Sequence, residues 1–165
     1  MAGAGMKDIK RRIKSVESTM QITKAMELVS SSKLRRAKEK VEKSRPYFNI
    51  LQETIQKVLD NTKSLKSVYT KEREIKNSLF IVIAGDRGLA GGYNANIIKA
   101  AVAEMEGKNP KIIPIGRKAS EYFGKRNYEV VEDYVNVAES LDFIDAALIT
   151  SVADEMYRDG KVDEV

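Results

Sequence analysis

The 165-residue sequence contains no cysteine and no histidine. These absences exclude disulfides, thiolate nucleophiles, Cys/His zinc sites and His-based triads, together with the usual general base near neutral pH. Most hydrolytic chemistry is therefore disfavoured. We expect no catalytic residue, no metal site and no cofactor.

Long apolar runs are also absent. The longest, residues 79–84, has six residues, against roughly 18 needed to span a bilayer. The N-terminus carries no apolar segment followed by a cleavage site, so no secretory signal is visible. Together with the missing cysteines, these features predict a soluble chain in a cytoplasmic compartment.

Glycine and proline are scarce in the first half. No glycine occurs between Gly5 and Gly85, and Pro46 is the only proline before residue 110. The sequence therefore predicts a long helix over residues 7–60. Its length of roughly 80 Å exceeds what a compact globule with a radius of gyration near 15 Å can contain. We expect Pro46 to kink this helix without ending it.

Apolar residues recur along this helix at alternating spacings of three and four, from Met6 to Leu65. A period of 3.5 residues is typical of a coiled-coil seam, which needs a partner helix. Burial of its large apolar residues is worth on the order of 10–20 kcal/mol as an upper estimate. The rest of the chain offers no helix of comparable length.

The seam is interrupted once, at Thr23, Glu27 and Ser30. There the apolar residues shift by about 100° around the helix. The shifted residues are Ile22, Ala25, Met26 and Val29. The shift is either an irregularity of the coiled coil or a change of contact surface.

Charge divides the chain into two halves. Residues 1–78 carry 19 Lys and Arg against 9 Asp and Glu, a net of +10, and residues 79–165 carry 10 against 15, a net of −5. We expect two domains, a coiled-coil helix over residues 1–65 and an α/β lobe over residues 77–165.

The second half alternates predicted strands and helices, which indicates a small, mostly parallel, Rossmann-like α/β layer. The run 78–84 is typical of a strand buried on both faces. Pro114 places a second strand, 111–116, at a sheet edge or at a bulge. Ser140 is the expected N-cap of a helix that extends to about Arg158. The remaining predicted elements are helices 93–106 and 117–125 and strands 128–132 and 162–165.

The first predicted strand ends in a glycine-rich segment. Its loop residues are Gly85, Asp86, Gly88, Gly91 and Gly92. The spacing fits neither G-x-G-x-x-G nor a Walker loop, so tight packing is favoured over nucleotide binding. We expect Asp86 and Arg87 to form a local surface pair of little energetic worth.

Two segments resemble a known family. ITKAMELVSSSKLRRA (22–37) closely resembles the N-terminal signature of the gamma subunit of F-type ATP synthases, and DRGLAGGYN (86–94) resembles that family's central motif. The segments KDIKRR (7–12) and IGRK (115–118) extend the similarity over essentially the whole chain. We therefore identify the chain by resemblance as a member of this family.

The resemblance implies a non-catalytic rotor shaft. In this family the N-terminal helix pairs with a C-terminal helix, and the coiled coil enters a hexamer of alpha and beta subunits. The lobe joins the epsilon subunit and the c-ring, and ion flow turns the shaft. These features imply a peripheral protein at the cytoplasmic face of a bacterial plasma membrane.

The resemblance also implies that the shaft meets acidic loops of the beta subunits at Met26. Basic residues of the shaft and of the glycine-rich segment become candidates for ionic contact with these loops. They are Arg11, Arg12, Lys24, Lys33, Arg35, Arg36 and Arg87. Without the resemblance, a solvated basic face would be the preferred interpretation.

The family continues beyond the equivalent of Val165, so we expect a truncated chain that lacks its C-terminal helix. Taken alone, the long helix should self-associate, fray or pack on another copy.

Two other interpretations stay open. A basic coiled-coil dimer could bind nucleic acid, although the basic residues are spread along the helix and do not precede a zipper. Duplex binding that weakens steeply with salt would favour it. An enzyme would need a carboxylate pair, and the pairs Glu132-Asp133 and Asp154-Glu155 are expected to face solvent.

Overall fold

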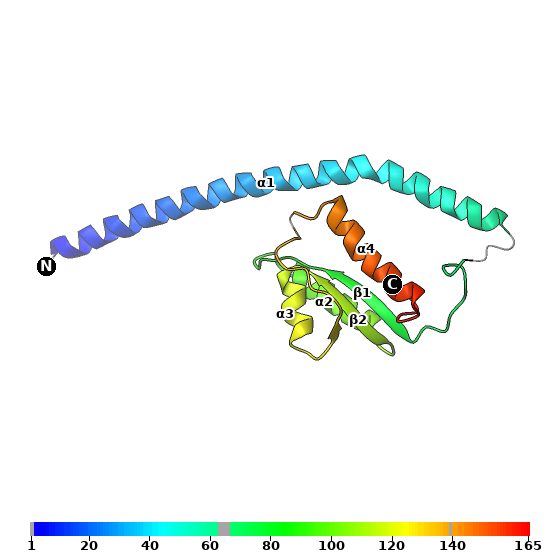
Figure 1. The fold of residues 1–165 in the computed structure, drawn as a ribbon. Coiled ribbons are helices and arrows are strands. Elements are labelled where there is room, and N and C mark those ends of the chain that lie inside the picture. Colours follow the sequence, from blue (N-terminus) through cyan, green and yellow to red (C-terminus); the bar gives the residue numbers. More distant parts are fainter. Residues whose placement is uncertain (1, 63–66, 139) are drawn as a thin grey trace. The chain divides into compact units, whose positions relative to one another are not determined.

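The computed structural model describes residues 2–62, 67–138 and 140–165 (Figure 1). The chain divides into two units, Met1–Leu65 and Lys66–Val165. We describe each unit by itself and call the second the lobe. None of the described helices combines the length and apolar composition needed to cross a membrane.

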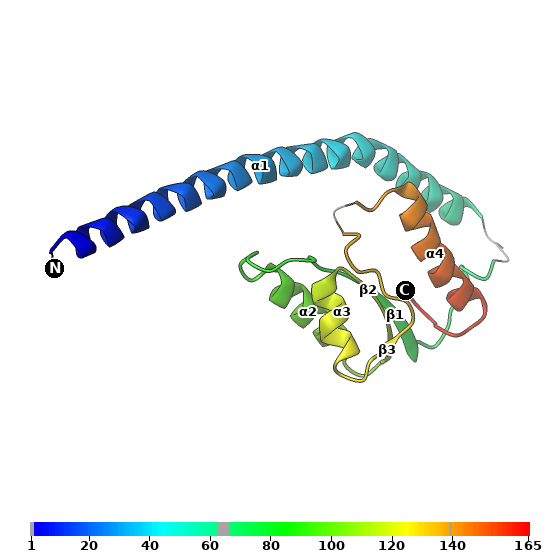
Figure 2. The ribbon, with the colours of Figure 1, turned by 60° about the vertical axis from the view of Figure 1, so that its left-hand side comes forward.

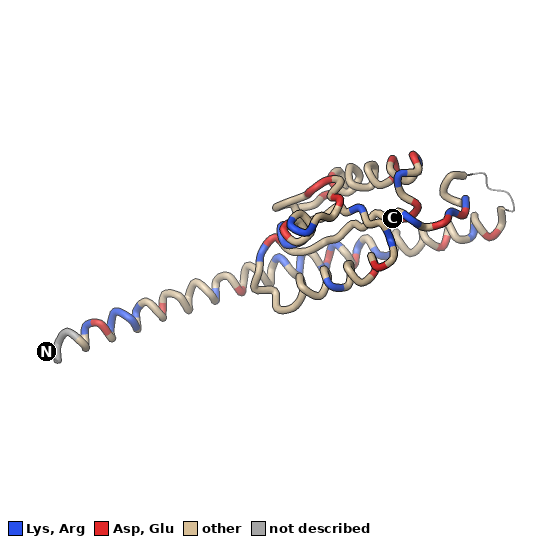
Figure 3. The backbone as a smooth tube through the Cα atoms, turned by 90° about the horizontal axis from the view of Figure 1, so that it is seen from below, with Lys and Arg blue, Asp and Glu red and all other residues tan. Residues whose placement is uncertain are grey.

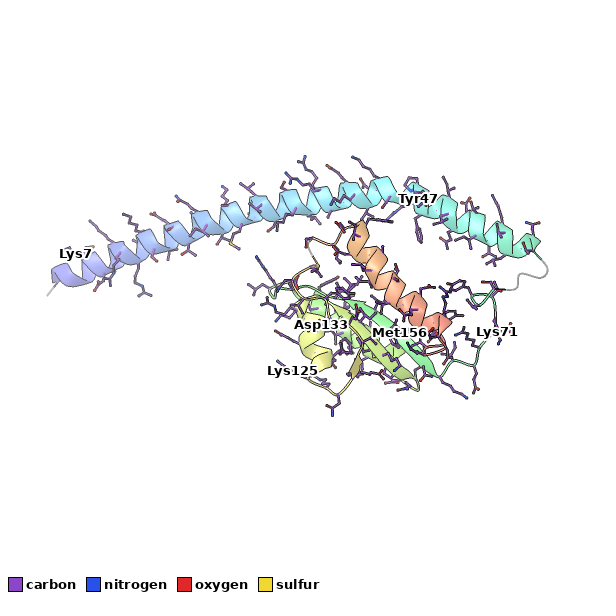
Figure 4. All side chains as sticks on the ribbon, viewed as in Figure 1. Lys7, Tyr47, Lys71, Lys125, Asp133 and Met156 are labelled. Atoms are coloured by element: carbon purple, nitrogen blue, oxygen red, sulfur yellow. The ribbon has the colours of Figure 1, made fainter. Side chains whose placement is uncertain are left out.

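The first unit is one helix, α1 (Ala2–Asn61), with Pro46 in its interior. At about 1.5 Å per residue, its 60 residues span about 90 Å. The prediction that the helix continues through the proline is confirmed. The axis changes direction beside Tyr47, which Figure 4 labels, as expected where a proline ring displaces the preceding turn.

The predicted seam lies along α1 with its large side chains exposed. Met6 is 60% exposed, Leu34 71% and Phe48 61%. An isolated helix cannot cover its own stripe, so the seam has the geometry of one half of a coiled coil.

The lobe is built on a parallel sheet of three strands in the order β1-β2-β3. The strands are β1 (Asn77–Ile83), β2 (Asn109–Ile115) and β3 (Glu129–Val130). Three helices accompany them: α2 (Tyr93–Glu104), α3 (Arg117–Gly124) and α4 (Phe143–Arg158). The predicted α/β class and parallel sheet are confirmed.

Helices cover both faces of this sheet, with α4 on one side and α2 and α3 on the other (Figure 2). On the first side, Leu79 and Ile113 pack with Met156 of α4, which Figure 4 labels. On the second side, Ile112 packs with Phe123 of α3. Alternation of side chains along the strands divides the apolar residues between the two cores.

The first strand is less buried than its apolar run predicts. Ile83, its last residue, is 52% exposed and belongs to neither of the two apolar cores. The prediction of burial on both faces is wrong at this position and holds for Leu79 and Val82.

Pro114 lies in the central strand, so of its two predicted positions the sheet edge is wrong and the bulge is confirmed. Its carbonyl accepts a hydrogen bond from the Tyr134 N–H (3.1 Å). Ile112 pairs with Val130, but Ile115 pairs with Tyr134. From Ile112 to Ile115 the chain advances by three residues, whereas from Val130 to Tyr134 it advances by four. This extra residue is a bulge opposite the proline, which has no N–H to donate.

Asp142, not Ser140, is the N-cap of α4. Its side chain accepts hydrogen bonds from the N–H groups of Ile144 (2.8 Å) and Asp145 (3.1 Å). The Asp145 carboxylate accepts in turn from the Asp142 N–H (3.0 Å), which completes a capping box. The Ser140 hydroxyl donates instead to the Val137 carbonyl (3.3 Å).

The segment 67–76, which the sequence analysis assigned to neither domain, packs on the lobe. The Arg73 guanidinium lies over the Tyr157 ring at 4.0 Å and donates to the Tyr157 carbonyl (2.8 Å). Asp163 accepts from the Asn77 N–H (2.8 Å). Beside it, Glu164 forms a parallel bridge with Ser78, where the sequence predicts the start of a strand.

Candidate partner-binding site

The eight residues predicted to contact a partner are all exposed, and they come from both units of the chain. Seven lie on α1 and one, Arg87, lies on the loop after β1. Basic segments recur along α1, whereas the lobe mixes both signs (Figure 3).

Met26 lies in a second stripe of α1, beside the seam. The residues of this stripe follow one another at spacings of four, three, four and three, so they share one helix face. We call the following set the Met26 stripe: Ile22, Met26, Val29, Lys33 and Arg36. It begins with three apolar side chains that are 58–61% exposed and ends with two cations.

The other predicted cations of α1 divide between the side of Met26 and the opposite side. Arg11 and Arg12 lie within about 60° of the Met26 direction, about four turns earlier in the helix. Lys24 and Arg35 lie about 160–180° away from Met26. Arg11 is 3.3 Å from Asp8 and Arg35 is 4.0 Å from Glu39, in exposed pairs of small energetic worth. The helix therefore presents positive charge on several sides.

Asp86 anchors the loop after β1. Its carboxylate accepts hydrogen bonds from the N–H groups of Arg117 (2.9 Å) and Asn136 (2.8 Å). Desolvation acts to raise the pKa of Asp86, but the N–H donors of Arg117, Asn136 and Ala138 and the Arg117 charge hold it below its usual value. The predicted pair with Arg87 is wrong, because the carboxylate is used by the backbone.

Asn94 closes the other end of the loop. Its side-chain oxygen accepts from the Gly85 N–H (2.8 Å), and its amide donates to the Arg87 carbonyl (3.2 Å). The tip between these anchors presents Leu89, which is fully exposed and has a φ of 60°. An exposed apolar side chain on strained backbone is unusual for a surface loop.

Gly116 allows the loop to lie against the end of β2. A Cβ at this position would be 2.0 Å from the Ala84 carbonyl oxygen, and φ is 93°. Gly91 also has a positive φ, of 55°. The close approach of Ala84 therefore requires glycine at position 116. At Gly88, in contrast, no atom lies within 4 Å of a Cβ, so packing does not require glycine there. The hydrogen bonds of Asp86 and Asn94 and the close approach at Gly116 therefore fix the position of this loop.

Sequence analysis assigned no role to Gly116, Asn94 or Asn136. Gly116 is the last residue of the predicted strand 111–116 and directly precedes the predicted helix. A glycine at such a junction is a signal of a tight turn. Asn94 is part of the motif at residues 86–94, but the motif does not show that its side chain binds Gly85. The Asn136 N–H binds Asp86 from 50 positions away, so no local pattern signals it.

The carboxylate pairs of the lobe serve local structure. Glu132 accepts from the Tyr134 hydroxyl, and this hydrogen bond raises the pKa of Tyr134 to about 12. Asp133 accepts from Ser120 (2.7 Å), and Asp154 accepts from Tyr69 (2.5 Å). Within the described ranges, no three acidic residues are grouped so that they could hold a metal ion.

The ATP synthase family model matches residues 5–165. The ATP synthase gamma chain of Alkaliphilus metalliredigens is 49% identical over 99% of this chain and 57% of its own length. The chain belongs to the ATP synthase gamma family. The gamma chain of Ruminococcus albus is 46% identical, over 98% of this chain and 58% of its own length. A gamma chain described as sodium ion specific, from Acetobacterium woodii, is 40% identical over 97% of this chain and 53% of its own.

The gamma-family chain thus spans a little over half the length of these relatives. Family membership confirms the resemblance found in the two motifs. The first motif lies on α1. The second covers the loop between β1 and α2 and the first two residues of α2. Nothing in these comparisons supports the alternative of a nucleic-acid-binding dimer.

Proposed function

We propose that this gamma-family chain is part of the central rotor shaft of an F-type ATP synthase. Its function is to couple ion-driven rotation to conformational change in the catalytic beta subunits, without itself making or breaking bonds. The observation that carries the proposal is the exposed seam along the 60 residues of α1, in a chain that belongs to the gamma family.

The seam supports a coiled coil with a second long helix. In the proposal that helix is supplied by the C-terminal part of the same subunit. Two helices wound together are stiffer than one and can transmit torque over the length of α1. Without the second helix, the chain pairs with another copy of itself.

The Met26 stripe supports contact with the alpha and beta hexamer. Its exposed apolar residues can press against a surrounding subunit. Lys33 and Arg36 at its end, with Arg11 and Arg12 earlier, attract acidic loops of beta at long range. Lys24 and Arg35 face other directions, so in each rotational position a different basic side of the shaft meets a given loop.

Coupling requires that the shaft bind one conformation of a beta subunit better than another. An apolar and basic stripe on one side of α1 provides such a difference, because it faces one beta subunit at a time. The lobe in this proposal joins the epsilon subunit and the c-ring. The assembly lies at the cytoplasmic face of the bacterial membrane, as a peripheral protein.

A disulfide crosslink tests the proposal, since the native chain has no cysteine. Met26→Cys, placed in a complete gamma chain and assembled with alpha and beta subunits, should crosslink to a cysteine in an acidic loop of beta. The crosslink should stop multiple-turnover ATP hydrolysis, and a reductant should restore it.

Arg35→Cys is the matched control, because Arg35 lies on the opposite side of α1 from Met26. It should crosslink to the same beta cysteine less efficiently at a fixed rotor position. A Met26 crosslink that forms fully and leaves turnover unchanged would contradict the rotor function.

A further inference from the structure

A groove of about 650 Å³ lies between α2 and α3, on the side of the sheet opposite α4. The two helices lie side by side in this layer (Figure 2). The apolar part of its lining comes from Ala95, Ile98 and Val102 of α2 and from Tyr122 of α3. None of these residues belongs to the surfaces assigned to the rotor function above.

The same groove gathers positive charge in an otherwise acidic half of the chain. Its lining includes Lys99 of α2, Lys118 of α3, and Lys125 and Arg126 at the end of α3, against Glu121 as the single carboxylate. Figure 4 labels Lys125. Since residues 79–165 carry a net charge of −5, this cluster is a local reversal of sign.

Of the nine described cations of the lobe that lie outside the groove, five pair with a carboxylate. Lys108 lies 2.7 Å from Glu164, Lys161 lies 2.9 Å from Asp159, and Arg158 lies 3.6 Å from Asp154. In the groove, Lys118 lies 3.6 Å from Glu121.

Three cations of the groove are left without a carboxylate. Among the described residues, Lys99, Lys125 and Arg126 have no carboxylate oxygen within 4.0 Å. The Arg126 guanidinium stacks at 3.9 Å over the Tyr122 ring, so its charge is held at the groove wall. The groove therefore offers uncompensated positive charge beside an apolar floor.

The spacing of these charges suits an extended ligand better than a single anion. Lys118, near the start of α3, and Lys125, directly after its end, are seven residues apart, which corresponds to about 10 Å along the helix axis. Charges spread over that length can each meet a separate anionic group. They match carboxylates two turns apart on a helix whose apolar side rests on Ile98, Val102 and Tyr122.

We propose that the groove between α2 and α3 binds an acidic amphipathic helix of a partner protein. The apolar side chains of that helix lie on the floor, and its carboxylates pair with Lys99, Lys125 and Arg126. The site shares no residue with the seam or the Met26 stripe, so this binding can be present whether or not the rotor function holds.

Fluorescence anisotropy on the 165-residue chain tests this directly. The probe is a labelled peptide of about 14 residues, which makes about 20 Å of helix, with leucine on one face and glutamate on both flanks. We expect saturable binding that weakens as salt rises, because the charges are exposed. A peptide with glutamine in place of every glutamate should bind at least about tenfold more weakly.

The decisive variant is Lys99→Glu/Lys125→Glu, with Lys71→Glu/Lys76→Glu as a control of equal charge change. The first should lower the affinity by about tenfold or more, and the control should change it by less than about twofold. Circular dichroism and urea unfolding of each variant confirm that the lobe is folded. Ala95→Trp, which fills the floor without changing charge, should also weaken binding.

Three results would overturn the proposal. They are no saturable binding of the acidic peptide at low salt, equal losses in the groove variant and its control, or equal binding of the glutamate and glutamine peptides. Vesicles of phosphatidylglycerol and phosphatidylcholine form a further arm. Binding to these vesicles that is lost in Lys99→Glu/Lys125→Glu, with no peptide binding, would assign the groove to a membrane surface and also overturn the proposal.

Discussion

Helix α1 and the lobe use apolar residues in opposite ways. In the lobe, Phe123, Ile112 and Ile113 are fully buried between helices and strands. On α1, Phe48 and Leu34 are more than 60% exposed, although the periodicity that places them is just as regular. Regular apolar spacing therefore specifies which face will be buried, whereas only a second element can bury it. The lobe contains its second elements, whereas no other described helix of the first unit covers the seam of α1.

The largest expected effect is at Gly116, where the backbone packs directly against the Ala84 carbonyl group. A side chain at this position should disrupt the lobe and leave α1 unchanged. Gly116→Val places a Cβ 2.0 Å from the Ala84 carbonyl oxygen at a φ of 93°, so we expect the lobe to lose more than about 4 kcal/mol of stability. Urea unfolding, followed by near-ultraviolet circular dichroism of the tyrosines, measures the change. Gly88→Ala, with open space around it, should shift stability by less than about 0.5 kcal/mol. Equal effects of the two substitutions would contradict this account of the loop.

Two phenylalanine truncations compare the two units directly. Phe123→Ala removes a side chain with no exposed surface and should cost about 3–5 kcal/mol in lobe unfolding. Phe48→Ala, at concentrations where the chain is monomeric, should change unfolding by less than about 0.5 kcal/mol. The same Phe48→Ala change should weaken association through the seam. A large loss from Phe48→Ala in the monomer would mean that the seam is already buried.

Acid should weaken the lobe through Asp86. The pKa of Asp86 is lower in the folded chain than its ordinary value. Its contribution to stability is therefore present above the unfolded pKa, near about 4, and lost as pH falls through the folded value. Asp86→Asn should cost about 1–2 kcal/mol at neutral pH and should make lobe stability less dependent on pH in acid.

Urea titrations at a series of pH values measure both effects. Glu106→Gln, on an exposed turn, is the control and should leave the pH dependence unchanged. A steeper acid loss in Asp86→Asn than in the native chain would contradict the sign of the shift.

The smallest predicted effect concerns the start of α4. Asp142→Ala removes two hydrogen bonds to the first turn and should cost about 1 kcal/mol. Ser140→Ala should change stability by less than about 0.5 kcal/mol. Thermal unfolding of the two variants side by side is sufficient, and the reverse order would restore Ser140 as the cap.

The sequence predicts elements well where local chemistry decides them. The absence of glycine and the 3.5-residue period predict α1. In the second half, the alternation of predicted strands and helices gives β1, β2, α2 and α3 within a few residues. Ser140 was chosen as the cap because a hydroxyl just before a helix is a good acceptor. An aspartate is an equally good N-cap residue. Asp142 is the N-cap in the structure because Asp145 completes the capping box with it.

What the sequence did not predict depends on contacts between distant residues. Arg73 binds the end of α4 from 84 positions away, and Pro114 lies in the central strand because both β1 and the segment from β3 to Tyr134 pair with β2. The groove cations come from two helices whose packing only the fold reveals. The partner-binding residues on α1 stay predictions, because a partner and not the chain itself determines their contacts.

Sedimentation velocity over a concentration series tests the central claim most directly. We predict that the chain associates as its concentration rises, with helical content rising in parallel, and that Leu51→Glu/Ile55→Glu in the seam abolishes both changes. A chain that stays monomeric at every concentration while circular dichroism shows α1 fully helical would contradict the claim that this helix needs a partner.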